Sequence, residues 1–179
     1  GLAVLSVRRS FTTIKAIIIL AIAEPGLDVP NRCSAIYMPE AESKKRVSIP
    51  VETIRQIQQS CVEHDDDMRW LIALISNTGM RLAEAAGLHI NDIKLEKDIP
   101  YMDIKPHPWR SLKTRGSQRQ VPLVGASLWA AQRINANASS CFAFPRYTDH
   151  DRCNANSASN ALNKWLHANF RKDIVIHGF

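Results

Sequence analysis

An almost unbroken apolar run, Trp70-Leu71-Ile72-Ala73-Leu74-Ile75, most constrains how this chain can fold. A helix of this composition is apolar all round, so other elements must cover it on every side. Asp65-Asp66-Asp67 precedes the run, and acidic residues are favoured where a helix begins because the helix dipole is positive there. Asn77-Thr78-Gly79 is typical of a helix end. The sequence therefore predicts a buried helix at the centre of a domain.

Weaker patterns predict the elements around this helix. Helices are expected from Ser48 to about Glu63, from Arg81 to Ala86, from about Ser127 to Ile134 and from about Asn156 to Phe170. Short β-type runs separated by turns are expected at Ile93–Leu95, Tyr101–Ile104 and Arg119–Leu123. The predicted fold class is mainly α with a small antiparallel β insert (α+β).

The N-terminal segment allows two interpretations. Arg8-Arg9 before the apolar run Ala16 to Ala23 is similar to a signal peptide, whereas Ile14, Ile17, Ile18 and Ala21 fall on one face of a helix from Ser6 to about Glu24. The apolar run is too short for a membrane span of about 20 residues, and we favour the helix. Pro25-Gly26 would end it, and residues 25–46 are interpreted as an interdomain linker.

Charge and composition narrow the class of partner. The chain of 179 residues carries 23 Lys and Arg against 17 Asp and Glu, a net charge of +6, and 45% of it is hydrophobic. This apolar content excludes a disordered chain. A basic domain favours a polyanionic partner such as nucleic acid, although many basic domains bind none.

The four cysteines suggest a metal site only weakly. Cys141, His150 and Cys153 lie close in sequence, but a structural zinc site usually has four ligands and a tight Cys-x-x-Cys or His-x-x-x-His pair. Free thiols in a reducing cytosol are the favoured interpretation. The cysteines therefore predict no metal site.

The segment Thr78 to Leu88 places Arg81 at the start of a short helix, directly after the buried one. A helix N-terminus offers free N–H groups, and a guanidinium adds a bidentate fork for a phosphate. Glu84 lies three residues further on the same face and could orient Arg81 or a neighbouring base. Spacing alone does not distinguish this site from a surface ion pair.

The segment Lys105 to Leu123 contains five basic residues and no acidic one. It falls between two predicted strands, which makes it a hairpin that could enter a nucleic-acid groove. Lys113 lies beside the turn residue Gly116, and lysine, unlike arginine, can donate a proton to a departing alkoxide. An exposed basic loop without a function is the usual alternative.

Together these segments resemble the tyrosine recombinase (phage integrase) family. Thr78-Gly79-Met80-Arg81-Leu82-Ala83-Glu84 is similar to its first-arginine box, and Leu112 to Gly116 with Arg119 to Leu123 is similar to its catalytic-lysine hairpin and following strand. Phe144-Pro145-Arg146, Leu162 to Leu166 and the His-x-x-Arg-like opening at Ile176 to Phe179 follow in the family's order. The resemblance implies residues 1–24 as the last helix of a core-binding domain and 47–179 as the N-terminal part of a catalytic domain.

The resemblance also implies a mechanism. A tyrosine attacks the scissile phosphodiester of double-stranded DNA and forms a phosphotyrosyl link, so no cofactor or small-molecule substrate is needed. Arg81 would hold the non-bridging oxygens, Lys113 would protonate the leaving oxygen, and His177 would contact the phosphate. Glu84 would support this site. The resemblance predicts DNA-backbone contacts for Arg110, Arg115 and Arg119.

The departures from the family concern the nucleophile. Tyr37, Tyr101 and Tyr147 all precede His177, whereas the family's tyrosine follows it, and Tyr147 is interpreted as a structural or surface residue. The chain reaches Phe179 where the family's second arginine would follow. We therefore expect a fragment that binds DNA without cleaving it, from a cytoplasmic bacterial or phage-encoded parent that is tetrameric on DNA. Arg81, Lys113 and His177 are expected to converge on one basic face.

Two other functions compete with this one. A non-enzymatic, basic helical DNA-binding regulator would account for the charge and the helices, but not for a lysine hairpin between the arginine box and His177. A metal-dependent phosphate-processing enzyme would need clustered Asp and His ligands, and Asp65-Asp66-Asp67 is more simply explained as a helix start.

Overall fold

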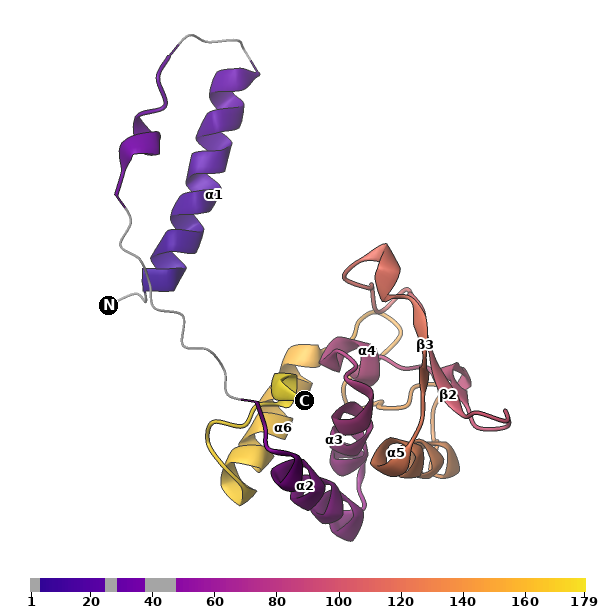
Figure 1. Cartoon of the computed structure of the whole chain (residues 1–179). Helices are drawn as coiled ribbons and strands as arrows, with labels where there is room; N and C mark the ends of the chain where they lie inside the picture. The colour runs from indigo at the N-terminus through magenta and orange to yellow at the C-terminus, as the bar shows by residue number, and fades with distance from the viewer. Residues whose placement is uncertain (1–3, 25–28, 38–47) are drawn as a thin grey trace. The chain divides into compact units, whose positions relative to one another are not determined.

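The computed structural model describes residues 4–24, 29–37 and 48–179, and the chain divides into two compact units, Gly1–Arg46 and Val47–Phe179. The predicted N-terminal helix is present as α1 (Val4–Ala23) in the first unit (Figure 1). No side chain of α1 is buried. Residues 25–28 and 38–46 of the predicted linker lie outside the described residues, and Arg32–Ala35 forms a 3-10 turn, η1. In the described ranges, no helix is long and apolar enough to cross a membrane.

Five helices frame the second unit (Figure 1). They are α2 (Val51–His64), α3 (Asp67–Thr78), α4 (Leu82–Ala86), α5 (Gly125–Ala136) and α6 (Ala155–Asn169). Helix α3 is the predicted central helix: it packs against α2, α4 and α5, and its residues 71–75 are all buried. Asp66 caps its start by accepting a hydrogen bond from the Arg69 amide at 3.0 Å. Gly79 ends it in the left-handed region with φ of 59°, where glycine has no steric penalty.

A three-stranded antiparallel sheet with the order β1-β2-β3 completes the unit. Its strands are β1 (Ile93–Lys94), β2 (Tyr101–Ile104) and β3 (Arg119–Pro122). In the register, Met102 is opposite Ile93 on one side and Val121 on the other, and all three side chains are buried. The alternation of buried and less buried residues along β2 places one face of the sheet on the core. The predicted fold class, mainly helical with a small antiparallel sheet, is therefore confirmed.

Short 3-10 turns connect these elements: η2 (Ile90–Asp92), η3 (Arg115–Ser117) and η4 (Ile176–Gly178). Helix α6 packs against both α4 and η4. It buries a stripe made of Ala158, Leu162 and Leu166, and Asn163 accepts a hydrogen bond from the Ile176 amide at 2.8 Å. Helix α6 therefore links the C-terminal turn to the short helix that follows Arg81.

We expect Leu74→Ala to destabilise the second unit by about 2–5 kcal/mol, because it removes a fully buried side chain from the central helix. The exposed Val51→Ala, at the start of α2, is the control and should change little. Denaturant unfolding followed by tryptophan fluorescence measures this change. The signal reports on the second unit alone, because it contains all four tryptophans, Trp70, Trp109, Trp129 and Trp165. Equal midpoints for the two variants would contradict the central role of α3.

Candidate active site

The carboxylate of Glu84 is the centre of the candidate site. Its side chain is only 3% exposed, and both of its oxygens are engaged. Oε1 accepts from Arg81 Nη1 at 2.9 Å, and Oε2 accepts from Arg119 Nη2 at 2.9 Å and from the Arg81 backbone amide at 3.1 Å. One buried acid therefore holds two arginines that are far apart in the sequence.

Local structure explains this meeting. Gly79 ends α3 and turns the chain, so Arg81 precedes the first turn of α4, and Glu84 lies in that turn. A carboxylate at this position can reach back to the free backbone amide at the helix start. Arg119 is the first residue of β3 and approaches from the sheet. Glu84 thus links the start of α4 to the start of β3.

The electrostatics leave this cluster positive. Burial raises the pKa of Glu84, but the hydrogen bonds from Arg119 and Arg81 outweigh it, and the net pKa lies below its ordinary value. Glu84 is therefore ionised at neutral pH and offsets one of two guanidinium charges. The Arg81 side chain is 51% exposed and that of Arg119 35%, so the remaining positive charge faces solvent.

The turn that carries Lys113 contacts this cluster. Ser117, at the end of η3, accepts a hydrogen bond from Arg81 Nη1 at 2.9 Å, and its Oγ lies 3.0 Å from Thr114 Oγ1. Lys113 precedes Thr114 directly and is exposed. The structure thus brings the lysine turn and Arg81 together, and Ser117, which the sequence analysis did not single out, is the residue between them.

His177 lies in η4 and is exposed. Both η4 and α4 pack against α6, so the two elements share a neighbour. Across residues 48–179, no hydrogen bond or ion pair joins His177 to Arg81. The convergence of His177 with Arg81 and Lys113 stays a prediction.

Arg110 was predicted to contact the DNA backbone, but its side chain is enclosed in the structure. Arg110 is 3% exposed, and its guanidinium donates to the backbone carbonyls of Glu84 and Lys105. Burial lowers its pKa. Gly87 makes room for it, because a Cβ at that position would lie 2.7 Å from Arg110 Cδ. A guanidinium enclosed in this way cannot reach a phosphate, and nothing in the local sequence separates it from its exposed neighbours.

The other two arginines predicted to contact DNA are Arg115 and Arg119. The backbone of Arg115 belongs to η3, but its side chain lies outside the described residues. Arg119 uses its guanidinium on Glu84 and on the Ser117 carbonyl, at 2.9 Å each, while part of it stays exposed. Their contacts with DNA remain predictions.

A second buried acid, Asp92, anchors the start of the hairpin, and the sequence analysis missed it. Asp92 is 1% exposed and pairs with Lys105 Nζ at 2.9 Å and with His107 Nε2 at 2.6 Å. The ring of His107 stacks on that of Trp109 with centroids 4.5 Å apart, and Trp109 Nε1 donates to the Gly87 carbonyl at 3.0 Å. This cluster fastens the hairpin to the end of α4.

The remaining sequence hypothesis concerns a metal site. Cys141 and Cys153 are free thiols, and within the described ranges no three His, Cys, Asp or Glu residues are grouped as metal ligands.

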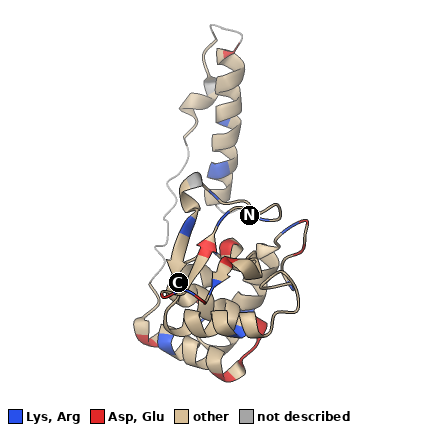
Figure 2. Cartoon of the chain, turned by 90° about the vertical axis from the view of Figure 1, so that its right-hand side faces the viewer, with Lys and Arg blue, Asp and Glu red and all other residues tan. Residues whose placement is uncertain are grey.

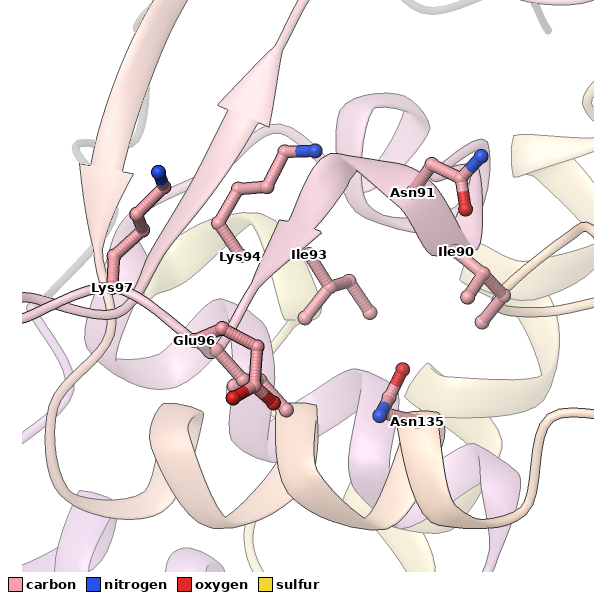
Figure 3. Close-up of a pocket in the computed structure, with 8 residues that line it drawn as sticks. Ile90, Asn91, Ile93, Lys94, Glu96, Lys97 and Asn135 are labelled. Atoms are coloured by element: carbon pink, nitrogen blue, oxygen red, sulfur yellow. The ribbon is translucent and has the colours of Figure 1, made fainter.

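A pocket of about 430 Å³ opens between β1 and the end of α5, and its lining includes Lys94, Lys97 and Asn135 (Figure 3). None of the candidate site residues lines it. Basic and acidic positions are interleaved over the ribbon (Figure 2), so the local pairing decides where positive charge is free.

Comparison with known proteins identifies the class. The phage integrase family model matches residues 48–179, and the chain therefore belongs to the phage integrase family, the tyrosine recombinases. No curated protein matches the sequence.

Solved structures of an integrase share the fold. The chain is similar to the Tn1549 transposon integrase in complex with circular intermediate DNA, with a TM-score of 0.70 at 15% identity, covering 99% of this chain and 64% of that one. A variant of that integrase in complex with transposon right end DNA gives a TM-score of 0.67, with the same identity and coverage. The chain thus spans 64% of the length of these integrase chains.

We expect Asp92→Asn to make stability less dependent on pH. Burial raises the pKa of Asp92, but the hydrogen bonds and charges of Lys105 and His107 lower it by a larger amount. The pKa of Asp92 in the folded protein therefore lies below the unfolded value of about 3.9. The folded state therefore binds fewer protons, and the stabilisation is present above the unfolded pKa and is lost as pH falls through the folded pKa. The free energy of unfolding of the wild type should exceed that of the variant by about 3 kcal/mol at pH 7.

Unfolding free energies measured from pH 7 down to pH 3 test this. The difference between the two proteins should begin to shrink below about pH 4, because Asp92 of the unfolded chain then takes up a proton that the folded carboxylate does not yet bind. A difference that stays constant over this range would show that the carboxylate charge contributes nothing.

Proposed function

We propose that this chain provides the arginine and lysine groups of a tyrosine recombinase active site, which breaks and rejoins double-stranded DNA through a phosphotyrosine intermediate in the whole protein. The observation that carries the proposal is the shared carboxylate of Glu84. It holds Arg81 and Arg119 side by side, with the lysine turn tied to Arg81 through Ser117. Exposed guanidiniums that a buried acid holds in place are suited to binding an anionic substrate.

Each side chain has a role that its surroundings support. Arg81 Nη1 donates to Glu84 and Ser117, and no described residue accepts a hydrogen bond from its Nη2. Nη2 would therefore donate to the non-bridging oxygens of the phosphate. Lys113 is exposed on a turn and would protonate the leaving 5′-oxygen. His177 would hydrogen-bond the phosphate or assist the proton transfer. Glu84 positions Arg81 and does not itself touch the substrate.

The nucleophile comes from elsewhere in the whole protein. Tyr147 is buried and Tyr101 is half-buried in β2, and both precede His177, whereas the family's tyrosine follows it. The phosphotyrosyl link would conserve the energy of the broken phosphodiester, so the reaction would need no cofactor. We propose that the chain as given binds duplex DNA without cleaving it, and that the whole protein acts as a tetramer on DNA in the bacterial cytoplasm. Residues 1–24 would belong to a core-binding domain and 47–179 to the catalytic domain.

We expect weak duplex binding by the chain as given, with strong salt dependence and little sequence preference. Neutralising three phosphates gives a log–log salt slope of about −2.7, and losing one contact reduces that slope by about 0.9. Fluorescence anisotropy on a labelled duplex at several salt concentrations measures the slope. Lys113→Ala should reduce it by one such step, whereas Arg55→Ala, which removes an exposed charge paired with Glu52, should not.

Two results would contradict this prediction. A flat salt response would exclude phosphate contacts as the source of binding. Tight, sequence-specific binding by this chain would favour the non-enzymatic regulator instead.

In the whole protein, we expect Arg81→Ala to lower the cleavage rate by about 10²–10³-fold or more, because a preorganised donor to the phosphorane is lost. The fold should persist, since the Arg81 side chain is half exposed and Glu84 keeps its bond to Arg119. Single-turnover cleavage of a labelled duplex measures the rate, and a thermal melt followed by circular dichroism measures the fold. Arg55→Ala is the matched control. An unfolded Arg81→Ala protein would instead make Arg81 a structural residue.

A further inference from the structure

We propose that Ser117 is a positioning residue, whose hydroxyl ties the turn carrying Lys113 to the guanidinium of Arg81. This inference rests on the proposed function, in which these two side chains serve one phosphate. Ser117 is 5% exposed, whereas the flanking Gly116 and Gln118 are exposed. A serine buried between two exposed neighbours needs partners for its hydroxyl.

The hydroxyl has two partners. Oγ accepts from Arg81 Nη1 at 2.9 Å and lies 3.0 Å from Thr114 Oγ1. The Ser117 amide also donates to the Thr114 carbonyl at 3.0 Å, which closes the turn. Because Lys113 directly precedes Thr114, the position of this turn determines the position of the Lys113 backbone.

The carbonyl of Ser117 completes a ring of hydrogen bonds. It accepts from Arg119 Nη1 at 2.9 Å, while Arg119 Nη2 reaches Glu84, and Glu84 returns to Arg81. The ring thus contains one backbone group and one hydroxyl of the same residue. Replacing Ser117 by alanine removes the hydroxyl bond to Arg81 and leaves the carbonyl bond to Arg119 in place.

This hydroxyl connects the two groups that the reaction must hold together. Lys113 is exposed and has no ion pair in the part of the chain that the structure describes. Arg81 has two side-chain acceptors, Glu84 and Ser117, and loses one of them in Ser117→Ala. The lysine turn would then move independently of Arg81, and the guanidinium would rotate more freely.

The test uses the chain as given, without DNA, and two measurements on the same variants. Hydrogen exchange of the amides of residues 113–117 measures the turn, and the Arg81 side-chain N–H resonances measure the guanidinium. Ser117→Ala should raise the exchange about tenfold, since it removes a hydrogen bond to a charged group, and should shift the Arg81 resonances. Ser117→Thr keeps the hydroxyl and should retain both properties. Ser111→Ala, an exposed serine of the same hairpin, is the matched control and should change neither.

Unchanged Arg81 resonances in Ser117→Ala would overturn the proposal, even with faster exchange in the turn, because the serine would then serve the turn alone. If Ser117→Ala unfolds the unit, Arg81→Ala decides, because it removes the other end of the same hydrogen bond and its side chain is half exposed. It should raise the exchange of the turn. Unchanged exchange in Arg81→Ala would overturn the proposal. Failure to bind DNA would contradict the proposed function and leave these measurements standing.

Discussion

The ion pairs of the buried Glu84 carboxylate are the interaction on which the rest of the candidate site depends. Placing a carboxylate in a site that is almost closed to water is costly unless cations and hydrogen bonds surround it. Arg81 and Arg119 meet that requirement from a helix start and a strand start that are far apart in the sequence. The acid therefore determines where α4 meets β3, and it aims two guanidiniums outward. Because one negative charge faces two positive ones, the site retains the charge that a phosphate would neutralise.

The hairpin between β2 and β3 is held at both ends by the same kind of interaction. Asp92 fixes its start through Lys105 and His107, and Glu84 fixes its end through Arg119. Arg110 lies between these anchors and bonds to the backbone of both sides. The base of the hairpin thus contains the buried charges of Asp92, Glu84 and Arg110, while Lys113 stays exposed near its turn. An anchored base with an exposed lysine is what the proposed role of Lys113 requires.

Similarity to the Tn1549 transposon integrase complexes extends over 99% of the chain at 15% identity, and it establishes the fold alone. Ser117, Arg119 and the Asp92 cluster matter to the candidate site as much as the motif residues do, because they hold Arg81 and the hairpin that carries Lys113 in position. The site is therefore best described as a network with two buried acids, from which the proposed catalytic groups project.

The sequence by itself determined the elements and the family motifs. The apolar run 70–75, the acidic residues before it and the terminating Gly79 specify α3 through local chemistry, and the short β-type runs at 101–104 and 119–123 predict two of the strands. Only the tertiary structure decided which charges are buried. Arg110 and Arg119 look alike in a basic hairpin, yet one is enclosed by backbone carbonyls and the other faces Glu84. Burial depends on partners that are dozens of residues away, and such pairing leaves no local pattern in a single sequence.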